Sequence, residues 1–253
     1  MTPKLLILGG TMESTAFCKA AAEAGLDGTV SFAGRVDRPV RQPLPQRVGG
    51  FGGAAGLADY VRDNAITHVI DATHPFAAQM STNAVEAAKM TGVPLIALTR
   101  APWVAQEGDN WTHVPDIEGA VGILNGSPRR VMLAVGRMHL DEFAPNPQHF
   151  YLLRLVDPPK DTPPFPDHHV LVSRGPFTTA DDTDLMRDHN IDLVVSKNAG
   201  GKGAYAKIEA ARALGLPVIM IGRPHIPARP EVSTPGQVLD WIRTGHLGTD
   251  RGV

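Results

Sequence analysis

Short, continuous apolar runs alternate along this chain with stretches of helical spacing. The first run covers residues 5–8 and stops at Gly9-Gly10, and a helical pattern then follows to Ala24. A buried parallel strand is apolar at every position, because helices cover both faces of its sheet. The opening therefore predicts a strand, a tight turn and a helix, which is the start of an α/β fold with parallel sheets.

The same alternation continues to about residue 223. Further strands are predicted over these ranges: 29–33, 67–72, 94–99, 130–136, 151–156, 170–173, 193–196 and 217–221. Helical spacing covers residues 57–64 and 77–91, and a further helix opens near Asp181. Residues 39–56 are too rich in proline and glycine for a long regular element.

Two stretches of the chain resemble each other in sequence. Residues 85–89 and 92–100 form a helix, a Gly-x-Pro turn, an apolar strand and a terminal arginine, and residues 208–212 and 215–223 repeat that order. We infer two related α/β halves, residues 1–125 and 126–253, with the crossover within 101–125. Chance similarity between two βαβ units is the alternative. Whether the terminal strands of each half stay in their own sheet is open.

The glycine turn after the first strand is a candidate pyrophosphate site. Gly9 and Gly10 let the chain turn sharply into a helix whose free N–H groups can hold a phosphate. Thr11 and Ser14 add hydroxyl groups, and either could cap the helix. The sequence is not G-x-G-x-x-G, so an ordinary tight turn is the alternative, but the first βα turn is where dinucleotides bind in this class of fold.

The end of the second predicted strand favours NADP over NAD. An acidic residue there accepts from a free ribose 2′-hydroxyl, whereas an arginine suits a 2′-phosphate. Arg35 stands at this place, with Arg38 close behind and only Asp37 to compete. A solvated surface arginine is the alternative. The glycine-rich segment ending in Gly52-Gly53 could lie against the cofactor or simply turn.

Two more strand ends carry polar residues. The strand at 67–72 ends in Thr73-His74-Pro75-Phe76, and the carboxyl ends of parallel strands are where α/β sites are built. The strand at 193–196 ends in a basic, glycine-rich loop, residues 197–205, whose amides and lysines suit an anion such as a carboxylate. That loop lacks the Gly-Lys-Ser/Thr ending of an ATP site. Asp181, Asp182 and Asp184 favour a helix N-terminus, so we expect no metal site.

Composition limits the possible partners. The chain has 253 residues, 43% hydrophobic and 20% charged, with a formal net charge of −2, which gives no support for a nucleic-acid or membrane partner. The single cysteine, Cys18, excludes an internal disulfide, suits the cytoplasm and is expected to fill the core. We see no secretory signal and no apolar run near the roughly 20 residues of a membrane span.

Six motifs, in order, resemble the precorrin-6A reductase family over nearly the whole chain. They are L-G-G-T-M-E-S at 8–14, A-G-R at 33–35, D-A-T-H-P-F at 71–76, S-R-G-P-F at 173–177, K-N-A-G-G at 197–201 and G-R-P at 222–224. The resemblance implies an NADPH-dependent oxidoreductase of cobalamin biosynthesis. Such an enzyme reduces a double bond of the precorrin-6A macrocycle, giving precorrin-6B, by transfer of a hydride and a proton. It also implies that the macrocycle lies between two Rossmann-like domains.

The resemblance also implies roles for particular residues. The pyrophosphate and nearby ribose would be held by Gly9, Gly10, Thr11, Glu13 and Ser14, the 2′-phosphate by Arg35, and the nicotinamide would lie near Thr73, His74, Pro75 and Phe76. The candidates for the polycarboxylate substrate are Arg137, Arg154, Arg174, Lys197, Gly200, Gly201, Lys202, Tyr205, Arg223 and His225. The proton donor is not identified; His74 is the candidate, and a hydrogen-bonded strand-end histidine is the alternative. We expect a monomer, because both halves of the site are in one chain.

Other function classes remain. A short-chain dehydrogenase needs Tyr-x-x-x-Lys, but the residues four places after the three tyrosines are Asn64, Leu155 and Glu209. A non-catalytic NADP-binding sensor remains open, because no strong acid–base constellation is evident. A two-domain sugar-nucleotide transferase is the third hypothesis, and binding of a UDP-sugar without NADPH would select it.

Overall fold

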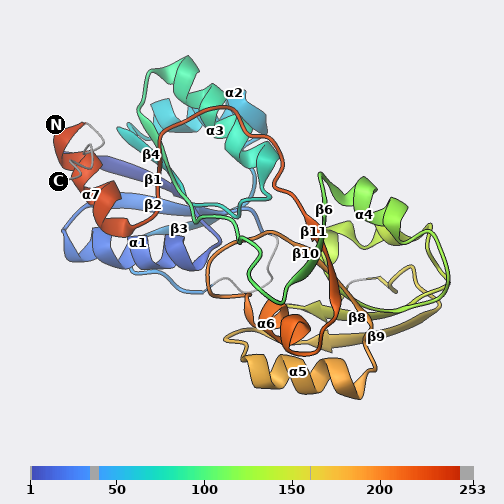
Figure 1. Ribbon diagram of the computed structural model, residues 1–253. Coiled ribbons are helices and arrows are strands. Elements are labelled where there is room, and N and C mark those ends of the chain that lie inside the picture. The colour runs from blue at the N-terminus through green and yellow to red at the C-terminus, as the bar shows by residue number, and fades with distance from the viewer. Residues whose placement is uncertain (1, 35–39, 160, 246–253) are drawn as a thin grey trace. The chain divides into compact units, whose positions relative to one another are not determined.

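The computed structural model describes residues 2–34, 40–159 and 161–245 (Figure 1). The chain forms two compact units, one of Met1–Ala101 with His225–Val253 and one of Pro102–Pro224. The expected boundary at 125/126 is therefore wrong, since the crossover segment belongs to the second unit and the C-terminal segment to the first.

The first unit contains a parallel sheet in the order β12-β5-β4-β1-β2-β3. Its strands are β1 (Lys4–Leu8), β2 (Asp27–Phe32), β3 (Gln46–Val48), β4 (His68–Asp71), β5 (Leu95–Leu98) and β12 (Glu231–Val232). This is the strand order of a dinucleotide-binding fold, in which ligands bind outside the carboxyl ends of the strands near β1 and β4.

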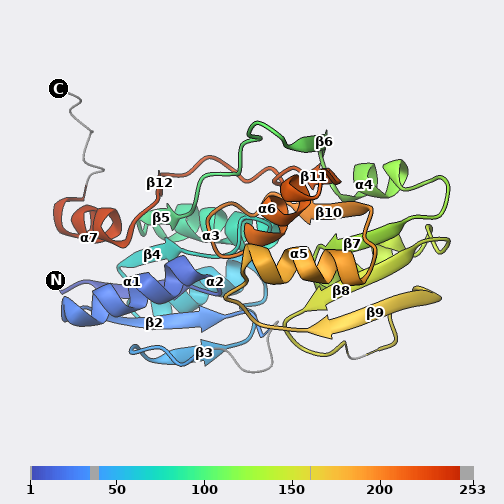
Figure 2. The ribbon, with the colours of Figure 1, turned by 60° about the horizontal axis from the view of Figure 1, so that its bottom comes forward.

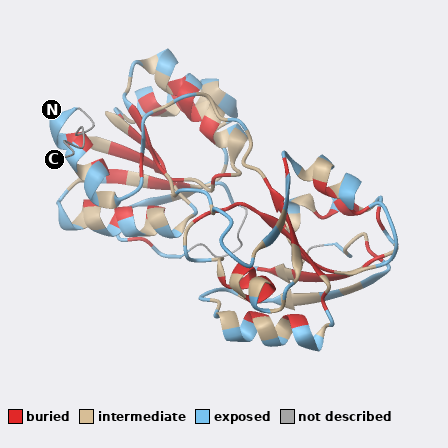
Figure 3. Cartoon of the chain, in the orientation of Figure 1, coloured by how far each residue is buried: buried red, intermediate tan, exposed pale blue. Residues whose placement is uncertain are grey.

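Helices cover both faces of this sheet, as the continuous apolar runs predicted (Figures 1 and 3). The helices are α1 (Met12–Glu23), α2 (Gly53–Asp63), α3 (Ala78–Thr91) and α7 (Pro235–Thr244). Leu5 and Ile7 pack toward α1 and α7, and Leu6 and Leu8 toward α2 and α3. Cys18 is buried on α1, and burial raises the pKa of its thiol to about 11, so it is a core residue as expected.

The second unit has the same architecture (Figure 2). Its parallel sheet has the order β6-β11-β10-β7-β8-β9. The strands are β6 (Asn110–Val114), β7 (Arg130–Ala134), β8 (Phe150–Leu155), β9 (Asp167–Val172), β10 (Leu193–Lys197) and β11 (Pro217–Ile221). Helices α5 (Thr179–Asp188) and α6 (Ala206–Ala213) pack on one face, and α4 (Ile117–Ile123) lies on the other (Figure 1).

The sixth strand of each sheet is exchanged between the two halves of the sequence. β6 follows β5 along the chain but pairs with β11, and β12 follows β11 but pairs with β5. The terminal strands thus leave their own sheets, which answers the question that the sequence left open. The shared strand order supports the inferred duplication.

The structure confirms the predicted strands and helices to within a few residues at their ends. It adds strands β3, β6 and β12, helices α4 and α7, and two short 3-10 helices at Arg137–His139 and Asp141–Phe143, none of which was assigned from the sequence. Within the residues that the structure describes, no helix is long and apolar enough to cross a membrane.

Candidate functional site

The turn between β1 and α1 requires both of its glycines. Gly10 has a φ of +126°, a backbone conformation that residues other than glycine rarely adopt. A Cβ on Gly9 would lie 2.9 Å from Val30 Cγ2 on β2, so a side chain would push the turn away from the sheet. The predicted tight turn is present, and it brings the backbone to the carboxyl end of β1.

The hydroxyl groups of this turn hold the turn itself. Thr11 caps α1 by accepting from the Ser14 amide at 3.1 Å, and Ser14 Oγ accepts from the amides of Gly10 and Thr11, each at 3.1 Å. Among the described residues, no acceptor is recorded for the amides of Met12 and Glu13. These two amides, which the sequence analysis did not single out, are the ones available to a phosphate.

Glu13 lies in the first turn of α1 and pairs with Arg100 just beyond β5. Glu13 Oε2 lies 2.6 Å from Arg100 Nη1, and both side chains are less than a quarter exposed. Arg100 therefore offsets a carboxylate charge that would otherwise repel a pyrophosphate at this helix end. Arg100 is the terminal arginine of the first predicted repeat, but no pattern in the sequence indicates its pairing with Glu13.

The strand end after β4 is organised by Asp71, a buried carboxylate. Asp71 Oδ1 accepts from the Thr73 amide at 3.2 Å and from Thr73 Oγ1 at 2.7 Å, which fixes the start of the turn. His74 follows, with Nδ1 accepting from the Phe76 amide at 3.2 Å, so a neutral ring carries its proton on Nε2. Pro75 is buried. The four predicted residues lie at the carboxyl edge of the sheet, as expected.

Arg229 reaches the same place from the returning C-terminal segment. Its side chain is 7% exposed and Nη2 lies 3.4 Å from Asp71 Oδ2. Its Nε and Nη1 are buried and have no hydrogen-bond partner among the residues that the structure describes. Burying a charged group without full pairing is costly, so this pair depends on the sheet around it. Neither Asp71 nor Arg229 was a candidate from the sequence. A carboxylate within the apolar run of β4 could have marked Asp71 as a candidate.

The edge expected to meet the adenosine end of the cofactor is described in part. Arg35 lies outside the described residues, so its assignment stays a prediction. Arg47 on β3 lies at this edge and donates to Ser31 Oγ at 2.7 Å and to the Gly49 carbonyl at 3.1 Å. Gly52 and Gly53, at φ +81° and +89°, form the left-handed turn into α2.

The second unit brings most of its candidate residues to the carboxyl edge of its own sheet. Arg137 follows β7, Arg174 follows β9 and Arg223 follows β11, while Lys197 ends β10. Arg137 donates to the Pro158 carbonyl at 3.3 Å, and Arg174 pairs with Asp157. His225 is an exception, because it belongs to the first unit and not to the second, where we expected it.

Arg154 forms a buried ion pair within the second unit. Its side chain is 8% exposed, pairs with Asp182 on α5 and lies 3.9 Å from the Phe177 ring centroid. Its charge is thus neutralised by a buried carboxylate, so Arg154 does not offer a free cation to a substrate. Asp182, expected only to favour a helix N-terminus, is the partner that the sequence did not reveal.

The glycine-rich loop after β10 leads into α6. Lys197 is buried, whereas Lys202 is exposed. Gly200 and Gly201 have φ values of +70° and +67°, which explains why glycine occupies both positions. Tyr205, at the start of α6, is half-buried and its hydroxyl accepts from Arg212 at 2.7 Å.

A buried lysine lies beneath this loop. Lys207 on α6 donates from Nζ to the Ala204 carbonyl at 2.6 Å, and Nζ lies 4.9 Å from the Trp103 ring centroid. Burial lowers the pKa of Lys207 to about 7, the nearby Arg154 acts in the same direction, and Asp182 opposes both.

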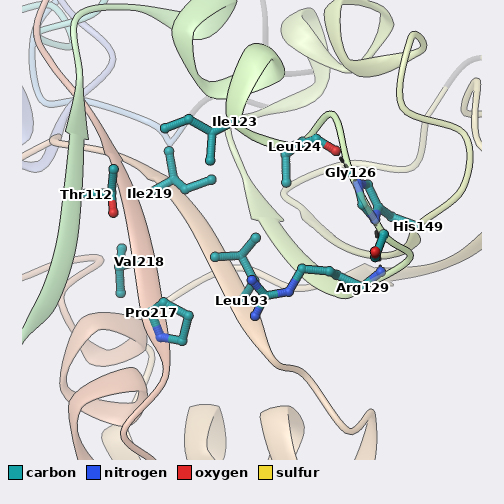
Figure 4. Close-up of a pocket in the computed structure, with 11 residues that line it drawn as sticks. Thr112, Ile123, Leu124, Gly126, Arg129, His149, Leu193, Pro217, Val218 and Ile219 are labelled. Carbon is teal, nitrogen blue, oxygen red and sulfur yellow. Dashed lines mark hydrogen bonds between the residues drawn. The ribbon is translucent and has the colours of Figure 1, made fainter.

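A pocket of about 280 Å³ opens at the other end of this sheet (Figure 4). Its walls include Leu193 and Pro217, which begin β10 and β11, and Arg129, which precedes β7 and pairs with Asp192. The amino ends of the strands are not where α/β enzymes bind their ligands. The pocket is therefore separate from the candidate residues at the carboxyl edge.

Comparison with known proteins agrees with this arrangement. The family model for precorrin-6x reductase CbiJ/CobK matches residues 4–243. Precorrin-6A reductase from Rhodobacter capsulatus is 56% identical over 99% of this chain and 99% of that protein. Precorrin-6A reductase from a Sinorhizobium species is 46% identical over 95% of this chain and 92% of that protein.

A solved structure of CobK precorrin-6A reductase has the same fold. It matches with a TM-score of 0.92 and 55% identity, covering 99% of this chain and 100% of that one. These relatives give no support to a non-catalytic sensor. The chain therefore belongs to the precorrin-6x reductase CbiJ/CobK family, in agreement with the resemblance that its six motifs showed.

Proposed function

We propose that this protein reduces one double bond of precorrin-6A, giving precorrin-6B, with NADPH as the hydride donor. The observation that carries the proposal is the 56% identity, over 99% of both chains, to a precorrin-6A reductase. Neither relative described above has cobalt in its name, so we propose the cobalt-free macrocycle as substrate.

The first unit is the proposed cofactor domain. The amides of Met12 and Glu13, the left-handed Gly10 and the carboxyl ends of β1 and β4 fit a dinucleotide pyrophosphate. Bound NADPH would supply the hydride. Arg35 is the proposed partner of the 2′-phosphate, and residues 73–76 would orient the nicotinamide and exclude water.

His74 is the proposed proton donor. The Phe76 amide donates to Nδ1, so Nε2 is the ring nitrogen that would pass the proton to the macrocycle. A doubly protonated ring would donate that proton and return to the neutral form. The substitution His74→Gln is expected to lower kcat by a larger factor than it changes the KM for NADPH. An unchanged kcat would remove His74 from this role.

The second unit is the proposed macrocycle domain. Precorrin-6A is a polycarboxylate, and the carboxyl edge of this sheet carries Arg137, Arg174, Lys202 and the glycine-rich loop. Loop amides and cations bind carboxylates through charge-assisted hydrogen bonds. Lys202→Ala is expected to weaken macrocycle binding and leave NADPH binding unchanged, and Lys89→Ala, an exposed lysine on α3, is the control.

The direct test is to mix the purified protein with NADPH and precorrin-6A and record two absorbance changes. Oxidation of NADPH and a change in the macrocycle chromophore should occur together and in equal amounts. NADPH binding without either change would refute the reductase proposal in favour of a sensor. Binding of a UDP-sugar without NADPH would favour a sugar-nucleotide transferase.

A further inference from the structure

Several carbonyl oxygens of the glycine-rich loop in the second unit accept hydrogen bonds from side chains outside the loop. Arg223 donates from Nε to the Asn198 carbonyl at 3.1 Å and from Nη2 to the Ala199 carbonyl at 3.2 Å. Trp103 donates from Nε1 to the Gly201 carbonyl at 2.7 Å. Three of the four carbonyl groups of residues 198–201 are thereby fixed by two side chains.

Trp103 is also bound to the loop through its own backbone. Asn198 Oδ1 accepts from the Trp103 amide at 2.7 Å, and Asn198 Nδ2 donates to the Trp103 carbonyl at 2.9 Å. Asn198 is 7% exposed, so losing either bond would leave a buried polar group unpaired. The indole and the backbone of one residue therefore hold both ends of residues 198–201.

The amide N–H groups of the same loop are not engaged in this way. Among the described residues, no acceptor is recorded for the amides of Gly200, Gly201, Lys202 and Gly203. Successive amides around left-handed glycines form a concave site for an anion. The bonds from Arg223 and Trp103 to the carbonyl oxygens fix the loop backbone, so these amides remain available to bind an anion.

The two donors come from the ends of the unit. Trp103 is the second residue of Pro102–Pro224 and Arg223 is its second-to-last residue. The loop is thus tied to the points at which the chain enters and leaves the second unit. Neither residue belongs to the loop. Trp103 is also not part of any polar motif in the sequence, so the sequence alone does not suggest a role for it in anion binding.

We propose that Trp103 and Arg223 are positioning residues, which hold the backbone of residues 198–201 so that the loop amides can bind a carboxylate of the macrocycle. The inference rests on the proposed function, which assigns the macrocycle to this loop. It predicts that substitutions at Trp103 change substrate binding although the side chain itself need not touch the substrate.

The test compares two tryptophan substitutions in the same unit. Trp103→Phe removes the donor to Gly201, whereas Trp111→Phe is a matched control, because Trp111 Nε1 has no recorded partner among the described residues. Trp103→Phe is expected to raise the KM for precorrin-6A about tenfold, the usual effect of one lost hydrogen bond to a positioned group. The kcat and the Kd for NADPH should stay within about twofold of wild type.

Arg223→Lys is the second variant, and it decides the matter if Trp103→Phe does not fold. A lysine cannot donate to both carbonyls in the fork geometry of an arginine, so a similar rise in KM is expected. Uroporphyrin, a polycarboxylate that the enzyme does not need to reduce, serves as a second probe, with binding followed by its absorbance. Both variants should weaken its binding, and Trp111→Phe should not.

The outcomes separate the two proposals. If the wild type reduces precorrin-6A but Trp103→Phe and Arg223→Lys match the control, the positioning role is wrong and the reductase stands. If the wild type binds uroporphyrin and the variants weaken it, but no reduction occurs, the positioning role stands and the proposed function fails. If the wild type neither reduces precorrin-6A nor binds uroporphyrin, both proposals fail.

Discussion

Removing the C-terminal segment should unfold the first unit and spare the second. A chain ending at Pro224 keeps every described strand of the second sheet but loses β12 and α7 from the first. Val238, Trp241 and Ile242 on α7 are each at most 8% exposed and pack against β1, β4 and β5. Their burial contributes about 5–9 kcal/mol, at about 1.5–3 kcal/mol for each side chain.

That loss is comparable to the whole stability of a typical domain, about 5–15 kcal/mol. The truncated chain also loses the hydrogen bonds of the Ala97 and Thr99 amides to the segment around β12, at 2.8 and 2.9 Å. We therefore expect the first unit to be unfolded or close to its unfolding midpoint in water.

Urea unfolding followed by far-ultraviolet circular dichroism measures this directly. The full chain should give native ellipticity, and the chain ending at 224 should lose roughly the helical signal of the first unit. A chain of residues 102–224 should fold alone, and a peptide of residues 225–245 added to residues 1–101 should restore structure. Native ellipticity and an unchanged midpoint in the truncated chain would refute the exchange as a source of stability.

Three further predictions concern charged side chains. Lys207 binds a proton less readily in the folded state, so the unfolded state holds more protons between about pH 7 and 10.5. The free energy of unfolding should therefore rise across this window by up to about 1.4 kcal/mol per pH unit. In urea titrations, Lys207→Met should abolish that dependence on pH. Arg35→Ala should weaken the binding of NADPH by about 1.5–3 kcal/mol and that of NADH far less. Equal losses for the two cofactors in a fluorescence titration would refute the 2′-phosphate assignment. Arg229→Met should destabilise the protein by about 3–5 kcal/mol, because Asp71 stays buried without its partner, and adding Asp71→Asn should recover part of the loss; additive effects would contradict the pairing.

Local sequence determined much of the fold. Continuous apolar runs predicted the buried strands because helices cover both faces of each sheet, and the repeat predicted two domains of the same architecture. The domain boundary was not predictable in this way, since nothing in residues 110–114 says which sheet they join. β12 has only two residues, too short for any periodicity.

One missed element did have a local signal. Thr234 caps α7, Pro235 occupies its first turn, and Gln237 completes a capping box. Val238, Trp241 and Ile242 then follow at helical spacing. This pattern predicts a helix but not its position, which depends on the strand exchange and therefore on contacts far apart in the chain.

The candidate site shows the same division between residue type and residue role. The sequence placed basic residues at the carboxyl ends of the strands, and the parallel sheets bring them to the expected edges. What each cation does depends on a partner that is distant in sequence: Arg154 meets Asp182, and Arg100 meets Glu13.

These pairings change which residues are suited to bind an anionic ligand. A cation that is buried against a carboxylate, as Arg154 is, cannot also neutralise a substrate without breaking that pair, which would cost several kcal/mol. Lys202 is exposed within the glycine-rich loop, and no carboxylate is bound to it among the described residues. The residues that bind the macrocycle are therefore best sought among exposed cations and loop amides, with the buried cations stabilising the backbone that presents them.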